Sequence, residues 1–406
     1  MTHFSITPFT RTIKQKPQYA QFVKKVDWLI DVKPDPGFGE TQLQYNSTKH
    51  YGQLTDGLNL LGHLNTIQAL SIRLSVTLPS PGSLESVNAF DIPFLPTPEH
   101  LLRSMALVSF SRLTDISYNC SPSPRPSYQH RYSPQVPWRS LQSVVLLASK
   151  SDSDLLHAPS TAQQDLIPYF SSSNLSRLAI TNLLEEDVRT EGLGDLIRSC
   201  RCLTDLTLDF RPDGSTPYSW LIDFVLRREP MQHIVKLTLV AIDGRDRHPS
   251  VLPLCAIFPK LEIFHLTPLR GLDNIIATMF PPSTAYKTLE RLYLACPRAD
   301  FRSRTSIQPS LSNFADFQSY PNLRTFSLIC FSPKVDYDAG VRTPKMQYLD
   351  LVEDLTTLAS GAPDQLELSY HFERVSGVAG RQVKSLHARG GGEVQSAWWI
   401  DLPGQE

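Results

Sequence analysis

Residues 203–208, Leu-Thr-Asp-Leu-Thr-Leu, decide the fold, because the same spacing of leucines recurs along most of the chain. The pattern Leu-x-x-Leu-x-Leu, or a close apolar variant, begins at six clear positions: Leu175, Leu203, Ile234, Leu261, Leu289 and Leu323. The five steps between them are 28, 31, 27, 28 and 34 residues. Such a period indicates a repeated structural unit that cannot bury its apolar face alone, so neighbouring units must stack.

Weaker copies of this leucine pattern extend the series in both directions, beginning at Val23, Ile67, Leu113, Leu141, Met346 and Val383. Apolar and polar residues alternate at the end of each copy, as in a half-buried strand. Segments between the copies are expected to be helices: 161–170, 193–200, 218–228 and 311–317. Strand, helix and parallel strand in succession predict an α/β leucine-rich-repeat solenoid, a horseshoe of about ten turns with a parallel concave sheet and outer helices.

We expect three parts: an N-terminal capping segment at 1–60, the solenoid at 61–389 and a C-terminal tail at 390–406. Two proline-rich stretches, near 78–98 and 119–137, should be loop insertions in the solenoid. The second contains Ser-Pro-Ser-Pro, a phosphorylation or polyproline-ligand candidate or simply a solvated loop. Three glycines open the tail and are expected to form a flexible joint. The two tryptophans after them either pack back as a cap, which we favour, or stay free.

Composition narrows the class of partner. The chain has 406 residues, with 39 basic and 40 acidic side chains and a net charge of -1. This balance argues against general binding to nucleic acid or to an anionic membrane. The six cysteines do not form a disulfide framework in a chain this long. We find no signal-peptide core and no apolar stretch long enough to span a bilayer, so we expect a cytoplasmic or nuclear protein.

The segment from Arg11 to Ile30 carries a pattern that is more specific than the leucine repeat. Its matching residues are Arg11, Thr12, Ile13, Pro17, Tyr19, Ala20, Phe22, Val23, Lys24 and Val26. They resemble the start of the repeats in fungal F-box and leucine-rich-repeat proteins, where such a segment follows the F-box. In that family the F-box docks onto a cullin-based ubiquitin ligase and the repeats hold the substrate. This sequence lacks the F-box. The resemblance therefore implies the substrate-recognition part, with a cullin-ligase adaptor as partner only if an F-box exists upstream.

The sequence gives little support for catalytic activity or for a metal site. The common phosphate-binding, serine-hydrolase, zinc-protease and dinucleotide-binding motifs are missing. Cys200 and Cys202 form the closest cysteine pair, but no second pair or nearby histidine completes a zinc set. We therefore expect a non-enzymatic protein with no catalytic residue, no cofactor and no metal site.

The residues that alternate with the leucines should point to solvent on the concave face of the sheet. Nine of them are candidates for binding a protein partner: Arg177, Asp205, Asp209, Lys236, His265, Arg291, Tyr293, Tyr348 and Asp350. The arginines and tyrosines among them are the strongest candidates, because these residue types carry much of the energy at interfaces. The plain alternative is that any solenoid needs polar residues there to stay soluble.

These expectations combine into one functional hypothesis. The chain should recognise another protein, as the substrate-recognition part of an F-box-type ubiquitin-ligase adaptor. The alternative is a stand-alone leucine-rich-repeat scaffold or inhibitor with no link to a ligase. The identity of the partner stays open, because specificity lies in variable exposed positions.

Overall fold

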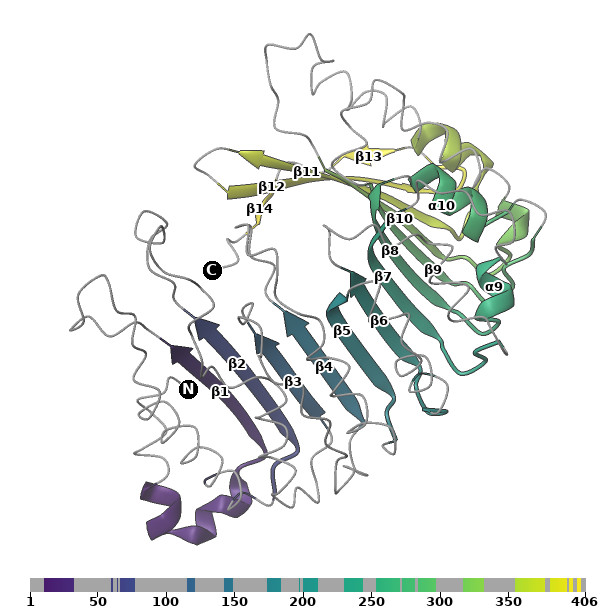
Figure 1. Cartoon of the computed structure of the whole chain (residues 1–406). Helices are drawn as coiled ribbons and strands as arrows, with labels where there is room; N and C mark the ends of the chain where they lie inside the picture. The colour runs from purple at the N-terminus through teal and green to yellow at the C-terminus, as the bar shows by residue number, and fades with distance from the viewer. Residues whose placement is uncertain are drawn as a thin grey trace, which may run out of the picture. The chain divides into compact units, whose positions relative to one another are not determined.

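Figure 1 shows the protein as a computed structural model of the whole chain. The structure describes residues 11–32, 60, 64, 66–76, 115–120, 142–148, 174–183, 197, 200–210, 230–243, 253–270, 272–281, 284–296, 317–331, 355–376, 380–392, 394–396 and 400–402. The chain forms two compact units, Met1–Leu203 and Thr204–Glu406. Their boundary falls inside the segment predicted as one solenoid, so periodicity did not reveal it.

The first unit is built from parallel strands. Residues 11–15 are helical and lead into the 3-10 helix η1 (Pro17–Phe22). Five strands follow: β1 (Lys25–Val32), β2 (Ala69–Val76), β3 (Asp115–Cys120), β4 (Ser143–Ala148) and β5 (Arg177–Leu183). Each pairs in parallel with the next strand along the chain. The hydroxyl of Thr66 donates to the carbonyl of Ala20 over 2.9 Å, which ties η1 to the entry of β2.

The second unit begins with the same arrangement. Its parallel strands are β6 (Asp205–Phe210), β7 (Lys236–Asp243), β8 (Ile263–Arg270), β9 (Arg291–Cys296), β10 (Thr325–Phe331) and β11 (Glu367–Ser376). Helices α9 (Leu254–Ile257) and α10 (Leu272–Met279), the 3-10 helix η5 (Phe317–Ser319) and a helix at 355–361 lie between strands in the sequence. Strand β12 (Gly380–Arg389) then pairs antiparallel with β11, and β13 (Gln395–Ser396) and β14 (Ile400–Leu402) pair antiparallel with β12.

One pattern of backbone hydrogen bonds recurs where the strands begin. The carbonyl of the residue directly before a strand accepts two N–H groups at the entry of the next strand, from the residue before that strand and from its first residue. Thr204 accepts from Val235 and Lys236, over 2.9 and 2.8 Å. Glu262 accepts from Glu290 and Arg291 over 2.8 and 3.0 Å, and the carbonyls of Lys24, Gln142, Val235 and Glu290 accept equivalent pairs. Because this hydrogen-bonding pattern recurs in both units, the leucine pattern specifies one local backbone geometry.

Stacked apolar side chains form the core of the second unit. Leu206, Leu237, Phe264, Leu292, Phe326 and Leu368 are register partners on successive strands, and all are at most 1% exposed. In Figure 1, α9 and α10 lie along one side of strands β7 to β10. Phe280, directly after α10, packs on Phe264 with ring centroids 5.8 Å apart. At β8 the leucine side of the sheet is therefore covered by the segment that contains α10.

Mixed α/β structure rich in parallel strands confirms the coarse fold prediction. Ten strands, β1 to β10, each begin two residues after the start of a predicted leucine pattern. Ile197 is helical and buried within the predicted helix 193–200. The predicted helices 161–170 and 218–228 lie outside the described residues. So do the two predicted insertions, except that Asn119 and Cys120 end β3.

The C-terminal part differs from prediction. The strand beside β10 is β11, whereas we expected the pattern that begins at Met346 to supply it; residues 346–352 lie outside the described part of the chain. Strand β11 was missed because its pattern, Leu366-x-Leu368-x-Tyr370, is one residue short. The pattern at Val383 was expected to form one more parallel turn. That prediction is wrong, because β12 runs antiparallel to β11 as the second strand of a hairpin.

The three glycines after β12 form a hydrogen-bonded turn and not the flexible joint that we expected. The N–H groups of Gly390, Gly391 and Gly392 donate to the carbonyls of Leu366, Ala359 and Arg389, over 3.0, 2.7 and 2.9 Å. The chain then returns to the sheet through β13 and β14. Trp398 and Trp399 lie outside the described residues. In the part of the chain that the structure describes, no helix is long and apolar enough to cross a membrane.

Candidate functional site: the polar face of the second unit

The side chains that alternate with the buried leucines form what we call the polar face of the second unit. Parallel register arranges them in two rows. The first row is Asp205, Lys236, Ile263, Arg291, Thr325, Glu367 and Arg389. The second row is Thr207, Thr238, His265, Tyr293, Ser327, Ser369 and His387. Residues that are distant in sequence thus become direct neighbours on one surface.

Two aromatic rings mark the centre of the second row. His265 of β8 and Tyr293 of β9 stack with ring centroids 4.2 Å apart and an interplanar angle of 21°. Both side chains are half-buried. Their row neighbours, Thr238 and Ser327, are much smaller, so the ring pair is the bulkiest feature of this row. Stacked rings keep few rotamers, and a rigid aromatic pair loses little entropy when a partner binds.

An ion pair lies beside the rings in the first row. The Lys236 ammonium is 3.0 Å from a carboxylate oxygen of Asp205, and the two side chains are 36% and 22% exposed. Partial burial lowers the pKa of His265, the charge of Lys236 lowers it further, and the charge of Asp205 offsets part of that fall. His265 is therefore neutral at pH 7. A neutral imidazole can donate one hydrogen bond and accept another.

Arg291 is the exposed cation of the site. It lies two positions before Tyr293 on β9, so both side chains project from the same face. Within the described residues it forms no ion pair. At the far end of the row Glu367 and Arg389 compensate each other, with an N–O distance of 3.7 Å, on highly exposed side chains. Arg291 therefore offers the guanidinium that a partner can reach without breaking an existing pair.

The structure brings together five of the nine predicted residues: Asp205, Lys236, His265, Arg291 and Tyr293. Arg177 is exposed at the start of β5, in the first unit. Asp209 is on β6 but only 9% exposed, so the prediction that it meets a partner finds no support in its burial. Tyr348 and Asp350 lie outside the described residues.

Sequence reasoning missed four residues of the polar face: Glu367 and Ser369 of β11, and His387 and Arg389 of β12. They were not found because β11 has the shortened pattern and β12 runs antiparallel. Ile263 also alternates with the leucines but was not among the nine candidates, because an aliphatic residue gives no chemical signal. It lies between Lys236 and Arg291 in the first row and is half-buried.

Elsewhere, the described residues contain no group of three or more His, Cys, Asp or Glu side chains able to hold a metal ion. Cys200 is buried and Cys202 is exposed, and neither forms a disulfide. Cys255 of α9 is half-buried, and that burial raises the pKa of its thiol, an effect that hydrogen bonds from its backbone and from Tyr286 reduce.

Comparison of the sequence with known protein families and with curated proteins found no match.

Proposed function

We propose that this chain is a leucine-rich-repeat solenoid that recognises another protein through the polar face of its parallel sheet. The observation that carries the proposal is the register of the second unit. It lines leucines up on one side and places an exposed arginine, two stacked rings and a partly buried ion pair on the other. Tyrosine and arginine at the centre of a surface are the residue types that most often dominate binding energy.

The repeat architecture draws support from the backbone. Ten strands begin at one fixed offset from the leucine pattern, and equivalent carbonyls accept paired N–H groups in both units. Parallel strands with return segments on the apolar side are what a stacked repeat requires. A solenoid leaves the opposite side of its sheet available over several strands, which suits recognition of a macromolecule better than the chemistry of a small substrate.

We further propose that the partner is a substrate presented to a cullin-based ubiquitin ligase. This part rests on the resemblance of Arg11 to Val26 to the start of the repeats in F-box proteins. The structure supports it to the extent that residues 11–15, η1 and β1 lead directly into the parallel strands. A stand-alone scaffold or inhibitor would share the same fold and the same binding face.

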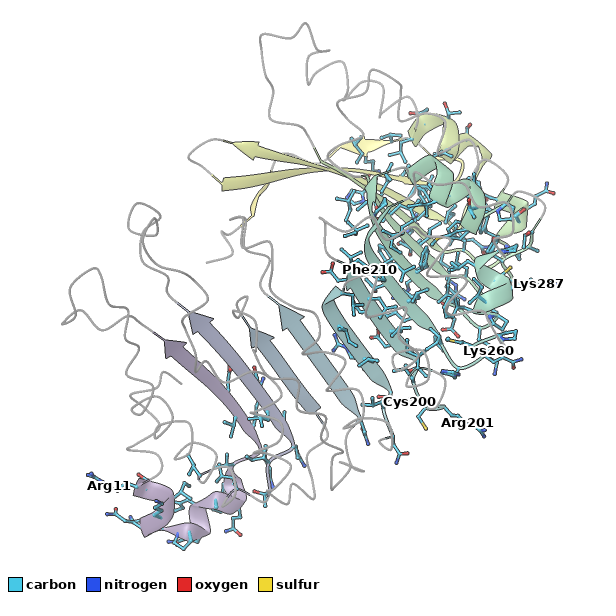
Figure 2. The ribbon with its side chains drawn as sticks, viewed as in Figure 1. Arg11, Cys200, Arg201, Phe210, Lys260 and Lys287 are labelled. Carbon is cyan, nitrogen blue, oxygen red and sulfur yellow. The ribbon has the colours of Figure 1, made fainter. Side chains whose placement is uncertain are left out.

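Affinity capture from cell extract tests the recognition surface. The full chain is compared with Arg291→Ala/Tyr293→Ala and with Lys260→Ala/Lys287→Ala, whose lysines are exposed in the turns before β8 and β9 (Figure 2). We expect the first variant to lose a partner that the wild type and the lysine variant retain. Circular dichroism checks that all three remain folded. A partner bound equally by all three proteins would refute the polar face as the recognition surface.

The ligase link has its own readout in the same experiment. If the link holds, the wild-type chain captures cullin-ligase adaptors and the partner becomes ubiquitinated in their presence. A stable stoichiometric complex without adaptors and without ubiquitin transfer would leave recognition intact and favour the scaffold or inhibitor.

A further inference from the structure

The charges of the polar face are balanced except at one place. Asp205 offsets Lys236 at 3.0 Å, and Glu367 offsets Arg389 at 3.7 Å. Arg291 lies between these pairs and is exposed. Glu290 directly precedes it at the strand entry, yet within the described part of the chain the two form no ion pair. The exposed row therefore has one uncompensated positive charge, on a side chain with five N–H donors.

Groups of complementary chemistry surround this guanidinium. Tyr293 lies two residues along the same strand, roughly 7 Å away between Cα atoms, and its hydroxyl can donate a hydrogen bond. His265 stacks against that ring at 4.2 Å and is neutral at pH 7, so it adds a donor without adding charge. Ile263 is the direct register partner of Arg291 on β8 and offers an aliphatic surface.

We infer that Arg291, Tyr293 and His265 bind a carboxylate carried by a peptide segment of the partner, with an apolar side chain of that segment against Ile263. The inference rests on the proposed function and adds the chemical class of what is recognised. Arginine binds carboxylates through two parallel hydrogen bonds. A phosphate, with about -1.5 to -2 charges, draws on several cations. Lys236 is already engaged by Asp205, so a single negative charge matches the site better.

A random library of twelve-residue peptides, selected on the immobilised full chain, tests this inference. We expect selected peptides to be enriched in Asp or Glu beside an aliphatic or aromatic residue. Synthetic pairs then separate two sources of carboxylate: Asp→Asn or Glu→Gln removes the side-chain acid, and a C-terminal amide removes the terminal one. Losing the acid that is bound should weaken binding about tenfold or more, measured by fluorescence anisotropy.

Protein variants identify the partner of that carboxylate. With Arg291→Ala, we expect acid and amide peptides to bind with equal affinity, because the group that distinguishes them is gone. Arg324→Ala is the matched control, an exposed arginine one residue before β10, and it should keep the full difference. Tyr293→Phe keeps the stacked ring and removes one donor, so it should reduce the difference by a smaller factor.

The outcomes are distinguishable. Peptides whose binding is lost in Arg291→Ala/Tyr293→Ala but does not depend on an acid would overturn the carboxylate and leave the recognition surface standing. Peptides that bind the double variant as well as the wild type would overturn both. Failure to select any peptide would overturn the inference that a linear acidic segment is bound, while capture of a folded partner would still decide the proposed function.

Discussion

At the scale of single residues, His265 shows how the sheet changes the chemistry of a side chain. Its pKa is lowered from 6.5 first by burial and then by Lys236, with Asp205 acting in the opposite direction. Below pH 6.5 the unfolded chain therefore takes up a proton at this position more readily than the folded chain does. The stabilisation from neutral His265 is fully present above pH 6.5 and is lost as the pH falls toward the lower, folded-state pKa.

This direction of the pH dependence can be tested with His265→Gln. We expect the urea midpoint of the wild type to fall more than that of the variant between about pH 7.5 and pH 5.5, because only the wild type must protonate this group on unfolding. Comparing the two proteins removes the contribution of the other histidines. Circular dichroism follows the urea unfolding of both proteins. If the urea midpoints of the two proteins fell by the same amount, the lowered pKa of His265 would be contradicted.

Three cysteines of known burial give a second residue-scale prediction. Cys202 is exposed, Cys255 is half-buried with a raised thiol pKa, and Cys200 is only 3% exposed. Because the thiolate is the reactive form and must be accessible, iodoacetamide should modify Cys202 first, Cys255 more slowly and Cys200 last in the folded chain. Mass spectrometry of peptides after timed alkylation measures the order. Rapid labelling of Cys200 would contradict its place in the core.

At the scale of elements, Gly390 joins the β11–β12 hairpin to the turn before β11. A Cβ atom built on Gly390 would lie 1.9 Å from the carbonyl oxygen of Pro363. The obstructing atom belongs to the backbone, so relief requires movement of the turn that precedes β11. The next residue, Gly391, has a φ of 68°, which side chains other than glycine adopt only at a cost. Glycine is required here by close packing and by backbone conformation.

We therefore expect Gly390→Ala to destabilise the second unit by about 1–3 kcal/mol through overpacking. Gly361→Ala is the matched control, since nothing lies within 4 Å of its added methyl group. It ends the helix at 355–361 and should change stability by no more than about 1 kcal/mol. Differential scanning calorimetry compares the two variants. A Gly390→Ala protein as stable as the wild type would show that β12 does not depend on this contact.

At the scale of the whole molecule, the repeat proposal implies that a destabilising substitution affects only the neighbouring strands. Phe264 is fully buried in β8, so Phe264→Ala should cost about 3–5 kcal/mol. If each turn is stabilised mainly by its neighbours, the loss should appear in β7, β8 and β9 and spare β1 and β2. Hydrogen exchange followed by mass spectrometry resolves these strands. A uniform rise in exchange over both units would indicate one cooperative globule and would count against a solenoid.

Each copy of the leucine pattern was enough by itself to predict the position of one strand. At Leu261, Phe264 and Leu266 the spacing places the first residue in the entry turn and the next two on one face of β8. This information is local, because the alternation of buried and exposed side chains has a period of two whatever the strand pairs with. Strand β11 escaped prediction for an equally local reason: one residue, and not two, separates Leu366 from Leu368.

The sequence by itself determined where ten strands begin and, in β6 to β10, that the leucine-pattern positions are buried. Only the tertiary structure decided that His265 stacks on Tyr293, 28 residues later, that Asp205 pairs with Lys236, and that Asp209 is nearly buried. It also decided that β12 turns back against β11. Each of these depends on which strand lies beside which and in what register, and that is set by long-range packing, whereas the leucine pattern acts within one turn of the chain.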